Sequence, residues 1–478
     1  MPLTTPSSEN LGDRNQTPPL RAVPASKLIA ANVYISEGRD RAVIDRLVRV
    51  LGGWRGQGRS DEADVNSFDF AKSSTLASTP STSAPPSSSS SSAERAGAAL
   101  VHVFVDEPYN RTGFTIAGLA SSSSSSGDDE EENERGDNNN ANDVANDTPS
   151  TSTSTSPSPS LSSVPAAIDL LAREALALVD WRLAGGSHPA IGVVDHVAVH
   201  ALFPNDSASK ASTSTTLTAE SEARAAARRV ARGLGRLGVP TYLYGSASVD
   251  AGDVGPSPKK EEWRKLAEVR RALGYFGPSA AASKEGGEGN PPSSSSSSSN
   301  FFARFPNPLP RPDAGPAAAE ASKGAAAVGS VPWVMNVNVP LVVAEEGESG
   351  NNSSSSFAAA AASVARAVSA RRGTPISKGG FALPGIEALA LSHMPGIVEV
   401  ACNLTDGSVR PAEVALAVEG AARQAGLAVQ RKEREKKSKE EKEEEEEEEV
   451  EDSSWYVTGK RPEEVAVEAA RALGLEIV

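Results

Sequence analysis

Blocks of apolar and polar positions with two different periods predict a fold of mixed strands and helices. Lys27–Ile35 is an apolar run that predicts a strand, and Arg39–Leu51 carries apolar residues at helical spacing. Further strands are expected at Leu100–Val105, Gly113–Ala117, Val193–Leu202 and Pro240–Tyr244, and further helices at Pro165–Leu183, Glu220–Leu237 and Lys259–Leu273. Their order is typical of the split β-α-β pattern, in which helices pack on one sheet.

The second half of the chain partly repeats this pattern. It predicts a strand-like segment at Ala325–Val343, strands at Ile386–Leu391 and Ile397–Ala401, and helices at Ala358–Ala370, Pro411–Ala425 and Arg461–Leu473. We therefore expect an α/β (α+β) fold of two stacked, ferredoxin-like sandwich subdomains. The expected ranges are 1–25 for a disordered N-terminus, 26–278 for the first subdomain, 279–322 for a linker and 323–478 for the second subdomain.

Six Ser-, Asn- or acid-rich stretches interrupt the periodic segments, at about 55–96, 119–162, 205–218, 279–308, 344–356 and 429–454. Such runs cannot bury enough apolar surface to offset the entropy lost on ordering, and with the N-terminus they remove roughly 200 residues from the core. We expect them to be disordered surface insertions without chemistry of their own, because the cost of closing a loop grows slowly with its length. The charged run at 431–449 has a second interpretation, a single charged helix.

Charge and cysteine content narrow the classes of function. The net charge of −15 argues against a general nucleic-acid or anionic-membrane binder. The single cysteine, Cys402, excludes a disulfide scaffold and a cysteine-cluster metal site, and it fits a reducing compartment. No apolar run is long enough to cross a membrane, and the N-terminus has no signal-peptide core. We expect a soluble, cytoplasmic protein, with organellar import left open.

The sharpest local feature is the loop from Gly185 to Gly192, which carries His188 just before an apolar strand. Glycines permit close approach of a ligand to the backbone, and proline fixes the local backbone angle. An imidazole at this place can take and return a proton near neutral pH. The alternative is a histidine that only hydrogen-bonds the loop, and the spacing does not decide between them.

Two further histidines, His196 and His200, share one face of the following strand, while Asp195 is expected on the other face. One interpretation is a zinc or iron site made of His188, His196, His200 and a carboxylate. The other is that neighbouring groups satisfy both strand histidines. Because no recognised metal-ligand spacing is present, no metal is expected.

A second concentration of polar residues lies at Asp106–Thr112. Arg111 offers a bidentate fork for a substrate carboxylate, and a carboxylate beside it can orient a base. Alternatively these residues only make a turn, with Arg111 paired to Glu107. Tyr242 and Tyr244, at another strand end, suit either a bound ring or the core.

Taken together these segments resemble the formiminotransferase domain, best known as the N-terminal half of formiminotransferase-cyclodeaminase. The strings that carry the resemblance are, in order, NVYISEGRD, VDEPYNRTGFTIAG, GGSHPAIGVVDH, VPTYLYG, PDAGP and WVMNVNVP. The chain looks closest to stand-alone plant- and alga-type members. It leaves no room for the all-helical cyclodeaminase half, so that activity is not expected.

The resemblance implies two α/β subdomains with a folate tunnel between them, and transfer of a formimino group from N-formimino-L-glutamate to N5 of tetrahydrofolate, as in histidine degradation. Tetrahydrofolate would be a co-substrate, the partners would be small molecules, and a homodimer is possible. The implied catalytic residues are His188 and Asp106, with the aspartate orienting the imidazole. The implied substrate-binding residues are Asn110, Arg111, Thr112 and Tyr244, and the implied folate-binding residues are Gly315, Pro316, Asn336 and Asn338.

The chain departs from the family in two loops. The turn between Asp106 and Asn110 is shorter than in the animal enzymes, and the loop after Pro316 is rich in alanine. An asparagine that the family associates with folate is replaced near Arg366. These departures favour a second hypothesis, a non-catalytic folate-binding protein. The histidine metal enzyme is the third.

Overall fold

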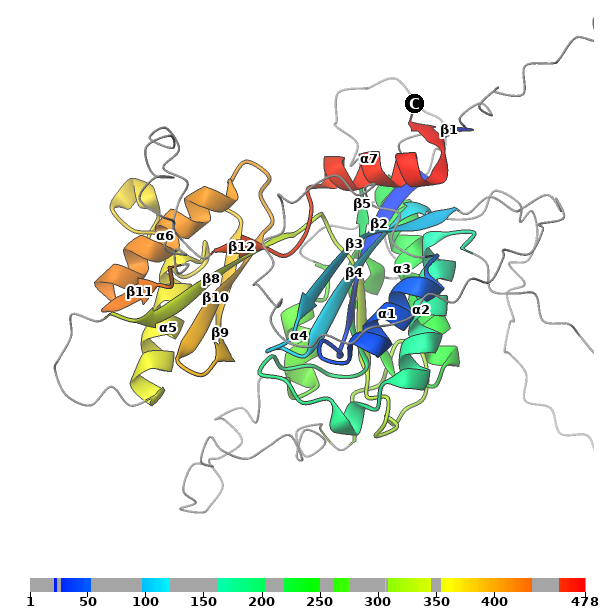
Figure 1. Cartoon of the computed structure of the whole chain (residues 1–478), viewed down its shortest axis with the longest axis horizontal. Coiled ribbons are helices and arrows are strands. Elements are labelled where there is room, and N and C mark those ends of the chain that lie inside the picture. Colours follow the sequence, from blue (N-terminus) through cyan, green and yellow to red (C-terminus); the bar gives the residue numbers. More distant parts are fainter. Residues whose placement is uncertain are drawn as a thin grey trace, which may run out of the picture.

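The computed structural model describes residues 21–23, 27–52, 97–120, 161–202, 219–249, 262–275, 306, 308–344, 354–431 and 455–477. Most of each low-complexity stretch lies outside these residues, apart from short ends such as 354–356, which begin a helix. The described parts form two α/β bodies that lie side by side (Figure 1). The predicted α/β class is confirmed.

The first body is built on a six-stranded sheet. In spatial order its strands are β3 (Ala98–Asp106), β4 (Arg111–Leu119), β2 (Leu28–Ile35), β5 (Val194–Ala201), β7 (Ala326–Ser330) and β6 (Thr241–Gly245). The first four pair antiparallel, whereas β5, β7 and β6 are parallel. Both β4 and β5 hydrogen-bond to β2, which therefore lies near the middle of the sheet.

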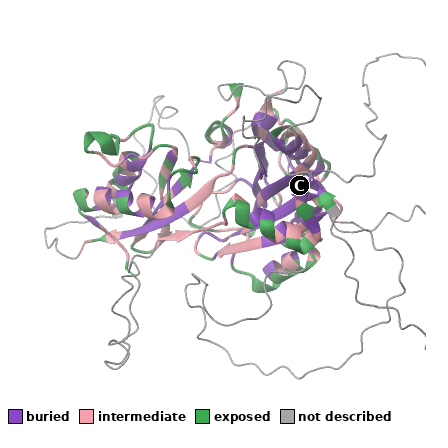
Figure 2. Cartoon of the chain, turned by 90° about the horizontal axis from the view of Figure 1, so that it is seen from above, coloured by how far each residue is buried: buried purple, intermediate pink, exposed green. Residues whose placement is uncertain are grey.

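Three helices cover one face of this sheet: α1 (Arg41–Val50), α2 (Val164–Leu178) and α3 (Ala219–Arg236). Every second residue of β2, from Ile29 to Ile35, packs into the core beneath them. Asp40 caps α1 by accepting hydrogen bonds from two backbone N–H groups. The helix expected at Pro165–Leu183 ends at Leu178, and the 3₁₀ turn η2 (Trp181–Leu183) follows it. Figure 2 shows the buried residues concentrated in these strands and helices.

The opposite face of the sheet is divided between two coverings. At one end α7 (Pro462–Leu473) packs Val465, Ala466 and Ala469 against apolar side chains of β2, β3 and β4. Beside it the short strands β1 (Arg21–Val23) and β13 (Leu475–Ile477) pair in parallel. At the other end α4 (Leu266–Ala272) packs on β6 and β7. Between α7 and α4 this face of the sheet is left uncovered by helices, and there it carries polar side chains such as Asn32 and Thr115.

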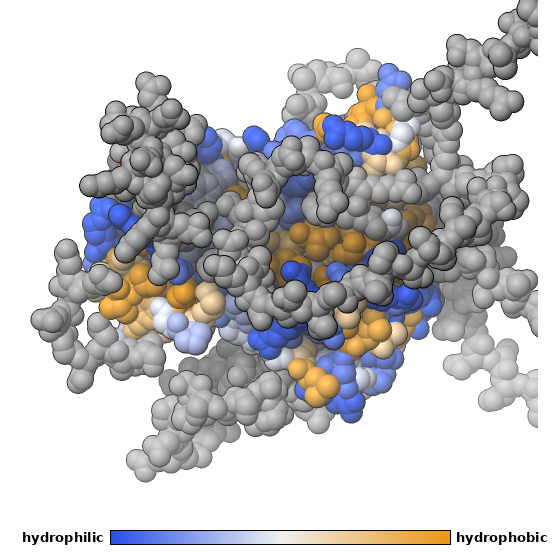
Figure 3. Space-filling model, in the orientation of Figure 1, coloured by the Kyte–Doolittle hydropathy of each residue, from blue (hydrophilic) through white to orange (hydrophobic). Residues whose placement is uncertain are grey.

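The second body is an antiparallel sheet in the order β11 (Leu427–Val429), β8 (Met335–Val343), β10 (Ile397–Leu404) and β9 (Ile386–Met394), with β12 (Tyr456–Val457) also on β8. The helices α5 (Ser354–Val368) and α6 (Pro411–Gln424) build its own hydrophobic core. Hydrophobic residues are visible on both bodies among hydrophilic ones (Figure 3).

The sheets do not divide where the sequence pattern placed the join. The expected strand-like segment Ala325–Val343 is two strands, because β7 belongs to the first sheet and β8 to the second. Pro332 lies between them and cannot donate a ladder hydrogen bond, so the run breaks there. In addition α7, expected in the second subdomain, returns to the first sheet. The expected boundary at 323 therefore separates β7 and α7 from the body to which they belong.

Candidate active site

The β3–β4 hairpin carries most of the polar residues singled out in the sequence. Asp106 and Arg111 pair across it, and Asp106 Oδ1 accepts a hydrogen bond from Tyr109 N at 2.9 Å. Asn110 adopts a positive φ of 50°, which asparagine tolerates, and its Oδ1 accepts from Gly38 N at 2.9 Å. A side chain at Gly38 would collide with Arg111 N, 2.5 Å from its Cβ position. The hairpin is thus fixed against the end of β2, and Asn110 serves its geometry.

Thr112, a second residue implied to bind substrate, also has a structural contact. It is fully buried, and its hydroxyl donates to the carbonyl of Glu37. Together with Asn110 it holds the hairpin that presents Arg111.

His188 lies half-buried on the loop between η2 and β5. Its Nδ1 is 2.6 Å from the carbonyl of Pro189, and its Nε2 is 3.0 Å from Nη1 of Arg111. A carbonyl only accepts and a guanidinium only donates, so the proton belongs on Nδ1 and the lone pair on Nε2. Burial lowers the pKa of His188 well below its usual value, and the charges of Arg111 and Arg270 add to this effect. The imidazole is therefore neutral at neutral pH, with Nε2 available as a base.

Arg111 is held by more than one group. Its Nη2 donates to Asp195 Oδ2 at 3.0 Å, and its guanidinium lies 4.2 Å from the centre of the Tyr34 ring. The alternative in which Arg111 pairs with Glu107 is wrong, because Asp195 takes that place. Asp195 is fully buried, and its second oxygen accepts from Ile191 N at 2.8 Å.

Asp195 was expected on the face opposite His196, and this expectation is also wrong. Tyr34 pairs with His196 while the next residue of β2, Ile35, pairs with Val194, so the register skips Asp195. This bulge turns its carboxylate toward Arg111. The alternation of a regular strand does not hold at this position.

Tyr244 and His196 form one buried contact in the same cluster. The Tyr244 hydroxyl lies 2.6 Å from His196 Nε2, and the His196 ring stacks on Tyr34 with centres 5.5 Å apart. His200 instead lies 3.0 Å from the carbonyl of Val331 through its Nδ1. Within the described ranges, no three His, Cys, Asp or Glu side chains are close enough to hold a metal ion. The structure thus does not bring His188, His196 and His200 together as a ligand set.

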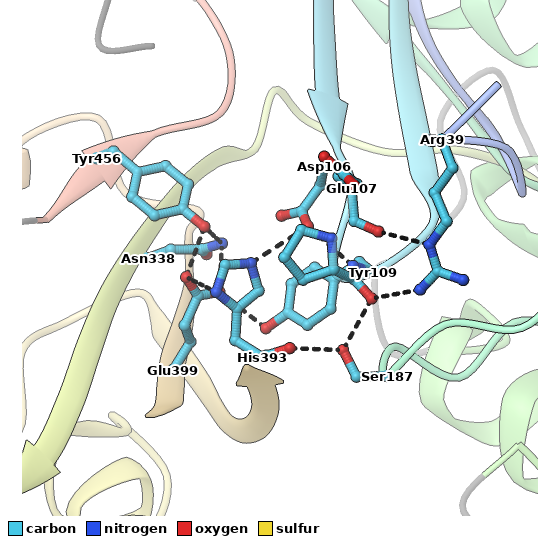
Figure 4. A network of polar contacts seen from close by, with 10 residues as sticks. Arg39, Asp106, Glu107, Tyr109, Ser187, Asn338, His393, Glu399 and Tyr456 are labelled. Atoms are coloured by element: carbon cyan, nitrogen blue, oxygen red, sulfur yellow. Dashed lines mark hydrogen bonds and ion pairs between the residues drawn. The ribbon is translucent and has the colours of Figure 1, made fainter. Parts of the chain in front are cut away.

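A second polar network joins the two bodies (Figure 4). His393, at the end of β9, places Nε2 3.2 Å from Asp106 Oδ1 and Nδ1 3.3 Å from Glu399 Oε1. Two hydroxyls donate to the Glu399 carboxylate, from Tyr109 at 2.8 Å and from Tyr456 at 2.6 Å. Because each ring nitrogen faces a carboxylate, the network favours His393 with both protons.

This network places Asp106 beside a histidine other than the one that the resemblance implies. The resemblance implies that Asp106 orients His188, yet its carboxylate contacts His393, and Arg111 is the residue that contacts the His188 ring. The Tyr109 ring lies between the two histidines, with its centre 5.1 Å from that of His188 and 4.7 Å from that of His393. Ser187 also donates to the carbonyl of His393 at 3.1 Å. The His188 loop is therefore attached to the second body.

Burial opposes the charged form of His393, but the hydrogen bond to Asp106 and the charges of Glu399 and Asp106 outweigh it and raise its pKa. Burial also raises the pKa of Glu399, an effect that the His393 charge and the two tyrosine hydroxyls reduce. Sequence reasoning missed both residues. The one available signal was Glu399 itself, an acidic residue within the apolar run of β10.

Comparisons with known proteins show the family. The chain matches the formiminotransferase domain, N-terminal subdomain, over residues 87–331, about half of its length. It is 30% identical over 334 residues to the formiminotransferase cyclodeaminase-like protein of Arabidopsis thaliana, covering 70% of this chain and 80% of the relative. The chain belongs to the formiminotransferase family. At this level it is a transferase, and the matched range ends one residue after β7, where the first sheet ends.

The residues that the formiminotransferase resemblance assigned to folate lie in two places. Asn338 is buried at the junction and donates to Glu399 Oε2 at 3.2 Å, and Asn336 lines a cavity beside it. Gly315 and Pro316 are exposed. Gly315 lies against Gly235, in the last turn of α3, and against Val239, which follows that helix. The two pairs are therefore not brought together in this structure.

The cavity beside Asn336 lies between the polar face of the first sheet and the segments that connect the bodies. Its wall includes Tyr34 and Thr115 from the sheet, and Trp333 and Lys460 from the connections. No helix in the described part of this formiminotransferase-family chain is long and apolar enough to cross a membrane.

Proposed function

We propose that this protein is a folate-dependent glutamate formimidoyltransferase, which transfers the formimino group of N-formimino-L-glutamate to N5 of tetrahydrofolate without cyclodeaminase activity. Family membership supports the reaction class. The observation that carries the proposal is a neutral His188, with the lone pair on Nε2, on a loop held between the two bodies. A base of this kind, at the junction of two bodies, suits proton transfer to and from a bound amine.

His188 takes the N5 proton as N5 forms its bond to the amidine carbon of the donor. The incoming N–H then replaces Arg111 as the donor to Nε2. When the bond from this carbon to the glutamate nitrogen breaks, the imidazolium returns a proton to that nitrogen, and glutamate leaves with its electron pair. The same two arginine charges that lower the pKa of His188 make its imidazolium a strong acid. His188 therefore serves both steps of the transfer.

The acceptor binds, in this proposal, at the junction between the bodies. The placement rests on the position of His188, whose loop is bonded to the second body through Ser187; the cavity lined by Tyr34 and Asn336, at about 20 Å³, is water-sized. Ligands of this size favour interfaces between domains. A complex in which tetrahydrofolate contacts only one body would contradict the placement.

A second candidate function is folate binding without catalysis. It is favoured by the contact between Asp106 and His393, since this contact leaves His188 without the carboxylate that the resemblance implies. Titration with tetrahydrofolate, with and without formiminoglutamate, separates the two. Binding of folate without any turnover of the donor would favour this candidate.

The deciding experiment is a formimino-transfer assay on the wild-type protein and on His188→Ala. The wild type should form 5-formiminotetrahydrofolate and glutamate in equal amounts, and the variant should be strongly impaired. A wild-type protein that binds folate and turns over no donor would overturn the proposal.

A further inference from the structure

Two arginines converge on one carboxylate beside His188. Arg111 of β4 and Arg270 of α4 approach the same oxygen of Asp195, at 3.0 Å and 3.7 Å. The arginine side chains are only 13% and 17% exposed, and the aspartate side chain is fully buried. Arg270 also lies over the Tyr275 ring, 4.5 Å from its centre. The sequence pattern had not singled out Arg270.

The charges of this cluster do not balance. Arginine stays protonated in proteins, so the pair contributes two positive charges against the single negative charge of Asp195. Burial, followed by the arginine charges, lowers the pKa values of His188 and His196 and keeps both neutral. The buried phenols of Tyr34, Tyr244 and Tyr275 stay protonated, because burial raises their pKa values. One positive charge remains uncompensated among these groups, which is costly in a buried place unless a bound anion neutralises it.

The arginines also differ in how fully they are engaged. The Nη atoms of Arg111 contact Asp195 and His188, whereas Arg270 makes the longer contact to Asp195 and lies over the face of the Tyr275 ring. The Nε–H of each arginine is buried and finds no hydrogen-bond acceptor among the residues that the structure describes. Buried donors of this kind normally have a partner, and an incoming oxygen ligand would supply one.

We propose that Arg270 binds a carboxylate of the acidic donor, while Arg111 positions His188. This inference rests on the proposed function for the identity of the donor. A single excess positive charge matches one carboxylate, and a guanidinium fork binds a carboxylate with two parallel hydrogen bonds. The ligand class is therefore an amino-acid carboxylate next to the reacting nitrogen. The earlier assignment of the substrate carboxylate to Arg111 moves to Arg270.

The test uses L-glutamate, the product of the proposed reaction, as the probe. Calorimetric titration of the full-length protein should show L-glutamate binding to the wild type and a loss of about tenfold to hundredfold in affinity for Arg270→Met. Arg270→Lys keeps the charge without the fork and should fall between them. Arg271→Met is the matched control, since Arg271 is the next residue of the same helix and is exposed, and it should bind as the wild type does.

Two amide analogues of glutamate test whether a carboxylate is the group that binds. One of the two singly amidated analogues, L-glutamine or L-isoglutamine, should bind the wild type weakly and lose little further affinity in Arg270→Met. In the transfer assay, Arg270→Met should raise KM for formiminoglutamate with a smaller effect on kcat. Equal glutamate affinity in wild type and Arg270→Met, or no glutamate binding by the wild type, would overturn the inference. If glutamate binding depends on Arg270 but no transfer occurs, the proposed function fails and the carboxylate site stands.

Discussion

His393 Nε2 lies 3.2 Å from Asp106 Oδ1, and this pair joins the second sheet to the hairpin that carries Arg111. The partners are 287 positions apart in the chain. Since Ser187 bonds to the backbone of His393, the same point also holds the His188 loop. The junction of the two bodies and the candidate active site are therefore one structural unit. A substitution that weakens the junction should also alter the active site.

The junction should be more stable at mildly acidic than at mildly basic pH. The pKa of His393 is raised above the usual histidine value of 6.5, and that of Glu399 is also raised. A group with a raised pKa in the folded state contributes stability that is fully present below its unfolded pKa and is lost as pH rises through the folded pKa. The difference in melting temperature between the wild type and His393→Gln should therefore be largest at about pH 6 and shrink toward about pH 8, which separates His393 from the buried histidines whose pKa values are lowered.

The matched control for this pH effect is His102→Gln. Burial lowers the pKa of His102, so its contribution is present above pH 6.5 and is lost as pH falls. For His102→Gln the loss of melting temperature relative to the wild type should be smaller at about pH 6 than at about pH 8, the reverse of His393→Gln. A difference between the wild type and His393→Gln that grows from about pH 6 to about pH 8 would contradict the assignment of the raised pKa to the junction.

Replacement of His188 by alanine should lower kcat by about 10²- to 10⁴-fold, the range of a positioned proton-transfer group. Tetrahydrofolate affinity should change little, because the imidazole acts mainly in the transition state. His200→Ala is the control, since His200 bonds to backbone carbonyls outside the cluster, and it should cost less activity. His196→Ala should also cost less than His188→Ala, since its ring nitrogen is engaged by Tyr244. Normal turnover by His188→Ala would reduce the loop to a structural role.

Arg111→Met should change the pH profile of the reaction. After burial, the charge of Arg111 is the next largest cause that lowers the pKa of His188, so its removal should raise that pKa. The acidic limb of the kcat/KM profile should move to higher pH, because His188 must be neutral to act as the base. Initial rates measured across the acidic range give the apparent pKa directly. Arg39→Met is the control, since Arg39 is exposed and its guanidinium, in the described structure, donates to backbone carbonyls and not to the His188 ring. An unmoved acidic limb would show that Arg111 does not set the protonation of His188.

The sequence was most informative where chemistry and periodicity are local. The Gly-His-Pro loop and the hairpin with Arg111 are contiguous strings, and the helices on the first sheet follow regular apolar spacing. It failed where one residue breaks the regular pattern. The bulge at Asp195 turns its side chain to the opposite side of β5 from the one that strand alternation predicts. Pro332 divides an apolar run between two sheets.

Long-range pairing was beyond the sequence pattern for a different reason. His393 and Glu399 lie on adjoining strands of the second body, and nothing in their local sequence names Asp106 or Tyr109 as partners. Arg270 sits on a short helix that begins at Leu266, later than expected; the described residues 262–265 before it are not part of the helix, and Lys259 lies outside the described residues. Such contacts follow from how the bodies pack, and no periodicity reports that packing.

A double-mutant cycle should decide which histidine Asp106 serves. Asp106→Asn keeps an oxygen to accept from Tyr109 N but removes the charge that faces His393. Combined with His393→Gln, it should show a coupling energy of about 0.5–3 kcal/mol in urea unfolding, as contacting residues do. Combined with His188→Ala, it should be additive within about 0.5 kcal/mol, because Asp106 and His188 share no hydrogen bond in the described structure. Glu107→Gln, at the exposed next position, controls for loss of charge. Strong coupling with His188 and none with His393 would restore the role that the family resemblance implies.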